Sequence, residues 1–227
     1  MEKERVPSLR ERFEYDKALK TNRDSFMERI QFADKYLNRP MASVIARAVF
    51  HTPVTPNGLT YFSCIVGLSG AYFFTRATHL DFILGGILAQ LCSILDGADG
   101  MLARAKNMCT RYGSNLDLFL DRVIDFFVLV GISVGAYFHY KNPTLTFLGT
   151  LSAGLYLLQI HMFYLTKDFL QLNEKGDNGE ARALLFWAIM IFGMINRLDI
   201  FIYALLAVTI TVNIARLIYF INLRTKY

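Results

Sequence analysis

The chain has 227 residues, of which 54% are hydrophobic and 19% are charged, and its formal net charge is +5. Its apolar residues fall into separated blocks of about 15–25 residues, the length needed to cross the hydrocarbon core of a membrane. This pattern excludes a soluble globular fold and predicts an all-α, polytopic membrane protein with one compact domain. The 3 cysteines provide no disulfide framework, because two of them lie inside apolar blocks.

The first part of the chain is polar. Residues 1–37 carry mixed charges, show helical tendency and contain no clear motif, and they are expected to form a cytoplasmic segment. Residues 38–56 are expected to form a juxtamembrane helix and linker. Four apolar residues share one side of this helix: Val44, Ile45, Ala48 and Val49. An amphipathic helix lying in the membrane interface is therefore predicted, with a soluble helix packed on a loop as the alternative.

Residues 57–227 are expected to form a domain of six transmembrane helices. The predicted spans are 59–75, 80–105, 114–140, 143–166, 182–195 and 198–223. An even number of spans places both termini on one side of the membrane. Of the 24 Lys and Arg residues, only Arg76, Lys141 and Arg197 fall on the opposite side. By the positive-inside rule both termini are predicted to be cytoplasmic, and the positive charge reflects topology rather than a nucleic-acid-binding patch.

Four aspartates lie within two of these predicted spans: Asp96, Asp99, Asp117 and Asp121. A charge in the middle of a membrane helix costs about 2.5–3.5 kcal/mol, so four suggest roughly 10 kcal/mol before compensation. At about 100° per residue, the first two share one helix face and the last two share another, which Asp125 continues. Two such faces turned toward each other form an all-oxygen cage. This cage favours two hard divalent cations, Mg²⁺ or Mn²⁺, with Ca²⁺ as a further occupant.

Other residues of this stretch suit a ligand that carries a phosphate or pyrophosphate. Gly100 and Gly113 remove side chains where a substrate would approach the backbone closely. Arg104, one turn beyond Gly100, can donate several guanidinium N–H hydrogen bonds to a phosphate. Each residue alone also has a structural explanation, as a packing notch or as an anchor at the membrane surface. Taken together, several residues that are energetically costly in a membrane helix and that recur at fixed spacings favour a binding site.

The second span extends roughly 21 Å from the outer surface of the membrane before it reaches Asp96, which puts the site toward the cytoplasmic side.

The full pattern from Asp96 to Asp121 is D-x2-D-G-x2-A-R-x8-G-x3-D-x3-D. It resembles the signature of the CDP-alcohol phosphotransferase (CDP-alcohol phosphatidyltransferase) family, and every fixed position is present. The resemblance implies an integral membrane enzyme of phospholipid biosynthesis. Such an enzyme transfers the substituted phosphate of a CDP-alcohol, such as CDP-diacylglycerol, to the hydroxyl of a small polar alcohol and releases CMP.

The same resemblance implies roles for individual residues. Asp96, Asp99 and Asp117 are expected to be metal ligands, and Asp121 both a ligand and the base that takes the proton from the attacking hydroxyl. Contacts with the nucleotide and donor phosphates are expected from a larger set: Thr55, Pro56, Asn57, Gly58, Gly100, Ala103, Arg104, Thr110 and Gly113. Homodimers are common in this family, although nothing in the pattern itself shows one.

The motif does not distinguish the acceptor alcohol. Arg122, buried in a predicted span, is expected to contact either an acceptor phosphate or the carboxylate of Asp125. Arg216, near the cytoplasmic end of the last span, either joins it or extends to the membrane surface. If both arginines face the cavity, inositol phosphate or glycerol phosphate is favoured over serine. The segment 55–57, together with residues 121 and 122, most resembles the enzymes that attach inositol phosphates.

Two other classes of membrane protein also use intramembrane carboxylates. A prenyltransferase would require two Asp-rich segments distant in sequence, whereas the four aspartates here lie between residues 96 and 121. A cation transporter predicts an inverted repeat or interrupted helices in matching halves, and the sequence shows neither. Both alternatives therefore explain less of the pattern than a phosphotransferase does.

Overall fold

The computed structural model describes residues 34–169 and 179–224. Its elements in chain order are the π-helix η1 (Asp34–Asn38) and the α-helices α3 (Arg39–Phe50), α4 (Pro56–Thr75), α5 (His79–Ala105), α6 (Arg111–Tyr140), α7 (Pro143–Phe169), α8 (Gly179–Met194) and α9 (Leu198–Arg224). No strand occurs within the two described ranges, which confirms the all-α prediction. The predictions for residues 1–33 fall outside the described residues.

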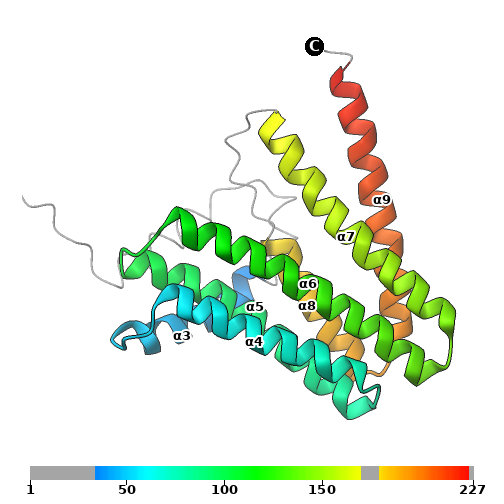
Figure 1. The fold of residues 1–227 in the computed structure, drawn as a ribbon, viewed down its shortest axis with the longest axis horizontal. Helices are drawn as coiled ribbons and strands as arrows, with labels where there is room; N and C mark the ends of the chain where they lie inside the picture. The colour runs from blue at the N-terminus through cyan, green and yellow to red at the C-terminus, as the bar shows by residue number, and fades with distance from the viewer. Residues whose placement is uncertain (1–33, 170–178, 225–227) are drawn as a thin grey trace, which may run out of the picture.

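Each of the six predicted spans coincides with one helix, α4 to α9, within a few residues at either end (Figure 1). Four of these helices are long and apolar enough to cross a membrane: α4, α5, the Pro143–Tyr164 part of α7 and the Leu198–Ile218 part of α9. The apolar part of α8, Arg182–Met194, is shorter. The four long apolar helices mark the chain as an integral membrane protein.

The helix boundaries follow local sequence signals. Thr55, Thr78 and Thr110 are the N-caps of α4, α5 and α6, and each side-chain oxygen accepts a hydrogen bond from the backbone N–H three residues later. Pro56 occupies the first turn of α4, where its missing N–H removes no helical bond. Between α5 and α6 the chain turns within residues 106–110, with Asn107 at a φ of 56°. This short link starts α6 at the same end of the molecule at which α5 finishes (Figure 1).

Small residues allow α4 to pack closely against both α5 and α6. A Cβ added at Gly131 in α6 would come 2.5 Å from the carbonyl oxygen of Ala71 in α4. A Cβ added at Gly85 in α5 would lie 3.0 Å from the carbonyl oxygen of Gly70 in α4. The backbones of α5 and α6, by contrast, make almost no close contact with each other. Helix α4 is therefore the element that packs against both α5 and α6.

We expect Gly131→Ala to destabilise this packing, because overpacking at a tight contact costs about 1–3 kcal/mol. Gly154→Ala in α7 is the matched control, since a Cβ there meets no atom within 4 Å. Thermal unfolding of the two purified variants in detergent measures the difference. Equal unfolding midpoints for the two variants would contradict the close approach of α4 and α6.

Peripheral helices complete the fold around α4, α5 and α6. Helices η1 and α3 pack against α5, and α8 lies against α5 as well. Helices α7 and α9 pack together and lean away from the central helices in Figure 1. Phe74, Phe82 and Phe186 are among the largest fully buried side chains, and they come from α4, α5 and α8. The acidic stretch lies on α5 and α6, which α4 and α8 hold in place.

Candidate functional site

Three carboxylates from two helices converge. Asp96 and Asp99 in α5 and Asp117 in α6 each offer one oxygen atom, and these oxygens lie within 4.8 Å of one another. Asp99 is buried, and the other two are partly buried. The structure thus brings together three of the four predicted metal ligands.

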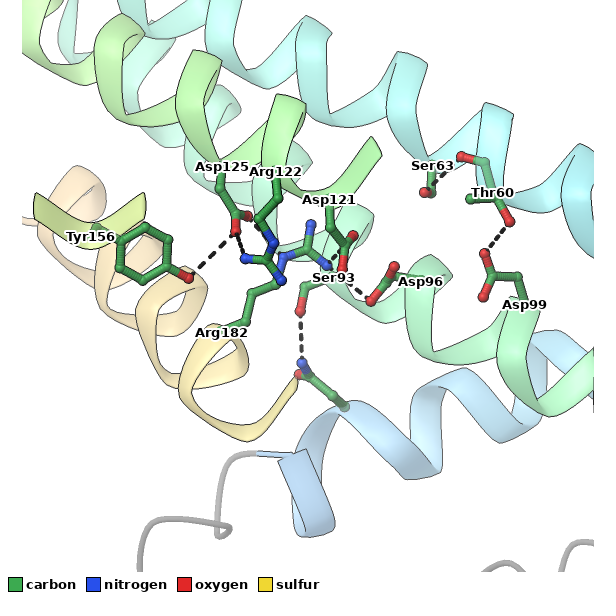
Figure 2. A network of polar contacts seen from close by, with 11 residues as sticks. Thr60, Ser63, Ser93, Asp96, Asp99, Asp121, Arg122, Asp125, Tyr156 and Arg182 are labelled. Atoms are coloured by element: carbon green, nitrogen blue, oxygen red, sulfur yellow. Dashed lines mark hydrogen bonds and ion pairs between the residues drawn. The ribbon is translucent and has the colours of Figure 1, made fainter. Parts of the chain in front are cut away.

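Helix α4 holds one of these carboxylates in place. Oγ1 of Thr60 lies 2.5 Å from Oδ2 of Asp99 (Figure 2). It also lies 3.1 Å from the carbonyl oxygen of Pro56. The Thr60 hydroxyl is buried, so its hydrogen bond to Asp99 is shielded from water. This bond fixes the orientation of the Asp99 carboxylate. Thr60 ends the segment 55–60, but only the structure shows that its side chain reaches the acidic cluster.

The donor set of this cluster fits a hard divalent cation. All three residues are carboxylates with no His or Cys among them, a set that suits Mg²⁺, Mn²⁺ or Ca²⁺ better than Zn²⁺. Oδ1 of Asp117 is buried and has no hydrogen-bond partner in the described part of the chain. A buried carboxylate oxygen without a partner costs free energy, which a bound cation would remove. Asp96, Asp99 and Asp117 can therefore hold such a cation.

The fourth aspartate faces an arginine. Oδ1 of Asp121 lies 2.7 Å from Nη1 of Arg182, near the start of α8. The same nitrogen is 2.9 Å from Oδ2 of Asp96, and Nε of Arg182 is 2.8 Å from Oδ1 of Asp125 (Figure 2). Arg182 is only 3% exposed, so three carboxylates share its charge away from water. Asp121 is thus linked to the carboxylate cluster through Arg182 and Asp96, and its role as a metal ligand stays a prediction.

Asp125 anchors a second arginine. It is fully buried, it lies 2.8 Å from Nη1 of Arg122, and it accepts a hydrogen bond from the Tyr156 hydroxyl at 3.4 Å. Of the two partners expected for Arg122, the structure therefore shows Asp125. Nε of Arg122 and Nη2 of Arg182 are buried and have no hydrogen-bond partner among the described residues. These two donors remain available to an anion.

Arg216 is engaged by a different helix. Its Nη1 donates to the carbonyl oxygen of Gln159 in α7, and its guanidinium lies 5.3 Å from the centre of the Phe163 ring. To contact the acceptor substrate, the side chain of Arg216 would have to give up these contacts with α7. The predicted role of Arg216 therefore gains no support from this geometry.

Six of the residues expected to contact the nucleotide lie at the starts of α4 and α6: Thr55, Pro56, Asn57, Gly58, Thr110 and Gly113. Oγ1 of Thr55 accepts from the N–H of Gly58 at 3.1 Å, and Oγ1 of Thr110 accepts from the N–H of Gly113 at 2.9 Å. A Cβ added at Gly113 would lie 2.9 Å from Oδ1 of Asn57, so the two helix starts are side by side. Two neighbouring helix N-termini favour negatively charged groups such as phosphates.

Gly100 and Arg104 lie close together at the end of α5. A Cβ added at Gly100 would lie 3.5 Å from Nη1 of Arg104 and would meet nothing closer. The carbonyl oxygen of Ala103 accepts from the N–H of Met108, which closes the turn after the helix. The surface above Gly100 is therefore lined by a guanidinium, a group suited to phosphate.

Sequence reasoning did not single out Arg182. The available signal was the need for a cation near intramembrane carboxylates, together with the position of Arg182 at the start of the apolar run 182–194. However, Arg182 lies 86 positions after Asp96, so no spacing rule connects the two residues.

A family model for CDP-alcohol phosphatidyltransferases matches residues 53–219. Because this match covers most of the chain, the protein belongs to the CDP-alcohol phosphatidyltransferase family. The matched region contains the acidic cluster, the starts of α4 and α6, and Arg182.

Two curated relatives are similar to parts of the chain. A bifunctional IPC transferase and DIPP synthase of Aquifex aeolicus is 34% identical over 125 residues, which cover 55% of this chain and 27% of that protein. An archaetidylinositol phosphate synthase of Pyrococcus horikoshii is 32% identical over 106 residues, which cover 47% of this chain and 55% of that protein. The similarity thus spans from about a quarter to about half of the length of these relatives.

The fold is also similar to that of the Mycobacterium tuberculosis phosphatidylinositol phosphate synthase. The structure of that enzyme with CDP-DAG bound matches with a TM-score of 0.62 and 19% identity, over 80% of this chain and 92% of the other. Its structure with manganese and citrate matches with a TM-score of 0.65 and 19% identity, over 80% and 87% of the two chains. At this identity the likeness shows a shared fold.

Proposed function

We propose that this chain is an integral membrane CDP-alcohol phosphotransferase of phospholipid biosynthesis. It transfers the substituted phosphate of a CDP-activated lipid such as CDP-diacylglycerol to the hydroxyl of a small polar alcohol, and it releases CMP. The observation that carries this proposal is the convergence of Asp96, Asp99 and Asp117 within 4.8 Å, in a chain of this family. The related fold solved with CDP-DAG bound supports this class of donor.

The residues of the cluster would hold two divalent cations, Mg²⁺ or Mn²⁺, and the related structure with manganese supports this choice. When bound, such cations neutralise the charge that develops on the departing phosphate. Thr60 orients Asp99, and Arg182 orients Asp96, by the contacts described above. The adjacent starts of α4 and α6 would orient the phosphates of the nucleotide.

Asp121 is the proposed base. Its carboxylate would take the proton from the attacking hydroxyl, a role that the family resemblance implies. Arg182, whose Nη1 is 2.7 Å from Asp121 Oδ1, keeps this carboxylate in one orientation beside Asp96. The acceptor would therefore be deprotonated next to the phosphate that it attacks.

A phosphorylated acceptor fits the charges around Asp121 best. Nη2 of Arg182 and Nε of Arg122 are buried donors without a partner in the described part of the chain. Both arginines bond to Asp125, which lies one helical turn after Asp121. A phosphate bound by their guanidinium groups would hold the acceptor hydroxyl near the base. The inositol phosphate products in the names of the relatives favour inositol phosphate over glycerol phosphate.

Incubation of the purified chain with CDP-diacylglycerol, a divalent metal and a panel of acceptors tests this proposal. The panel contains inositol phosphate, glycerol phosphate, inositol and serine, and released CMP is measured. We expect CMP to be released only when both a divalent metal and a phosphorylated acceptor are present. The release should be fastest with inositol phosphate. Release with serine or inositol alone would overturn the acceptor assignment, and no release with any acceptor would overturn the function.

We further propose how the chain lies in the membrane. All six helices α4–α9 would cross it, residues 57–227 would form the catalytic domain, and the segments 1–37 and 38–56 would precede it on the cytoplasmic side. Helix α3 packs Ala42 and Ala46 against α5 and exposes Val44, which suits a helix in the interface between water and lipid. The partners in this arrangement are membrane lipids, the two substrates and a second copy in a homodimer, with no nucleic acid.

Labelling of a single Cys introduced within residues 1–20 tests the orientation. We expect an impermeant thiol reagent to label it only after the cells are permeabilised, because the termini are predicted to be cytoplasmic. Labelling in intact cells would show that the N-terminus lies outside the cell and would contradict the predicted topology.

A further inference from the structure

A buried asparagine connects the segment before α4 to two helices of the site. Asn38, the last residue of η1, is 4% exposed. Its Oδ1 accepts from Nε2 of Gln90 at 2.7 Å and from Nε1 of Trp187 at 2.9 Å, and its Nδ2 donates to Oγ of Ser93 at 3.1 Å. Gln90 and Ser93 belong to α5, whereas Trp187 belongs to α8. One amide group thus ties α8 to α5.

This connection lies close to the charged site along both helices. Ser93 and Asp96 share one face of α5, because they are three residues apart. Trp187 follows Arg182 in α8 by little more than one helical turn. Figure 2 shows Ser93 on the same stretch of α5 as Asp96, beside the side chain of Arg182. Asn38 therefore acts on the part of α8 that carries Arg182.

Arg182 depends on the position of α8 for its contacts. Its guanidinium contacts Asp96 on α5 and both Asp121 and Asp125 on α6, so a small shift of α8 changes all three distances. The other described polar bond from α8 to α5, between His79 and the Met194 carbonyl oxygen, lies at the far end of α8. The Asn38 amide uses both its oxygen and its nitrogen in buried hydrogen bonds, and such bonds favour one arrangement of the groups they join. Among the described residues near the site, Asn38 makes the other polar connection between α8 and α5, besides the ion pair of Arg182 with Asp96.

We propose that Asn38 is a positioning residue for acceptor binding. By hydrogen bonding to Trp187, Gln90 and Ser93, it fixes the middle of α8 against α5 and so holds Arg182, little more than one turn away, between Asp96 and Asp121. This inference rests on the proposed function, because it takes Arg182 as a group that receives the acceptor phosphate. On this proposal, the segment that contains Asn38 and precedes the first predicted span contributes to substrate binding as well as to membrane attachment.

Steady-state kinetics of Asn38→Leu test this proposal. Leucine is close in size to asparagine but cannot form hydrogen bonds. In this variant the side-chain N–H groups of Gln90 and Trp187 therefore lose the oxygen to which they bond. We expect the KM for inositol phosphate to rise at least about fivefold, which is the effect of losing a single hydrogen bond, while the KM for CDP-diacylglycerol and the kcat change less than twofold. Trp187→Phe, which removes only the bond to α8, should raise the acceptor KM in the same direction.

A double variant and a control separate positioning from general loosening. Asn38→Leu combined with Trp187→Phe should have the same acceptor KM as Asn38→Leu alone, because the hydrogen bond that Trp187→Phe removes is already lost in Asn38→Leu. Tyr140→Phe is the control, since it removes a 2.9 Å hydrogen bond to the Asn196 carbonyl oxygen at the other end of α6. It should leave both KM values unchanged. An equal rise of donor and acceptor KM in Asn38→Leu would overturn the proposal.

Fluorescence gives a readout that does not depend on turnover. Trp187 is the sole tryptophan, so the emission of the protein responds to the surroundings of this ring, which include its hydrogen bond to Asn38. We expect Asn38→Leu to shift the emission maximum and Tyr140→Phe to leave it in place. An unshifted emission, or a shifted emission with an unchanged acceptor KM, would each overturn the proposal. If the wild-type chain releases no CMP with any acceptor, the proposed function fails, and the emission still decides whether Asn38 holds α8.

Discussion

Replacing Asp121 with Asn is expected to lower the kcat for CMP release by about 10²–10⁴-fold, the usual contribution of a general base. The amide has the size of the carboxylate but cannot accept the proton of the attacking hydroxyl. Because Asp96, Asp99 and Asp117 are unchanged, the variant should still bind Mn²⁺. Turnover at saturating substrates and a titration with Mn²⁺, followed by electron paramagnetic resonance, measure the two effects separately.

Asp199→Asn is the matched control for this variant. Asp199 forms an ion pair with the half-exposed Arg197 at the start of α9, outside the acidic cluster, so its replacement should leave kcat unchanged. Normal turnover of Asp121→Asn would remove Asp121 from the role of base. Loss of Mn²⁺ binding in the same variant would show instead that Asp121 is an essential ligand.

Replacing Arg182 with Met is expected to destabilise the protein and to weaken acceptor binding together. Met keeps most of the aliphatic length but leaves Asp96, Asp121 and Asp125 without their shared cation. Removing one partner of a buried ion pair costs about 3–5 kcal/mol. Thermal unfolding in detergent should show this loss, and added Mn²⁺ should restore part of it, because a ligand that binds only the folded state stabilises it.

Arg197→Met provides the comparison, because it breaks an ion pair whose arginine is 54% exposed. Exposed pairs contribute little to stability, so the unfolding midpoint of this variant should stay close to that of the wild type. Equal losses in Arg182→Met and Arg197→Met would show that the buried network around Arg182 does not stabilise the fold.

The helices and much of the acidic cluster follow from signals that are local in sequence. Apolar blocks indicate where α4 to α9 lie, and N-cap threonines mark the starts of α4, α5 and α6. The short link after α5 brings two acidic helix faces together, so Asp96, Asp99 and Asp117 could be predicted to converge. Asp121 lies on the same face as Asp117, but about 6 Å further along the helix, which is beyond the oxygens of the cluster.

The residues that hold the cluster could not be predicted in this way. Thr60 reaches Asp99 across 39 positions, Asn38 reaches Ser93 across 55, and Arg182 reaches Asp96 across 86. Such contacts depend on how whole helices pack, and helical periodicity contains no information on that packing. The sequence showed that the carboxylates need a cation, but only the packing of α8 shows that Arg182 supplies one.

Anomalous diffraction from crystals of the full chain grown with Mn²⁺ tests the metal site most directly. We predict an anomalous peak bounded by the carboxylates of Asp96, Asp99 and Asp117, with oxygen distances of about 2–2.5 Å, as is usual for hard divalent cations. Crystals that contain Mn²⁺ but show no peak there, with these carboxylates pointing apart, would contradict a metal-dependent phosphotransferase.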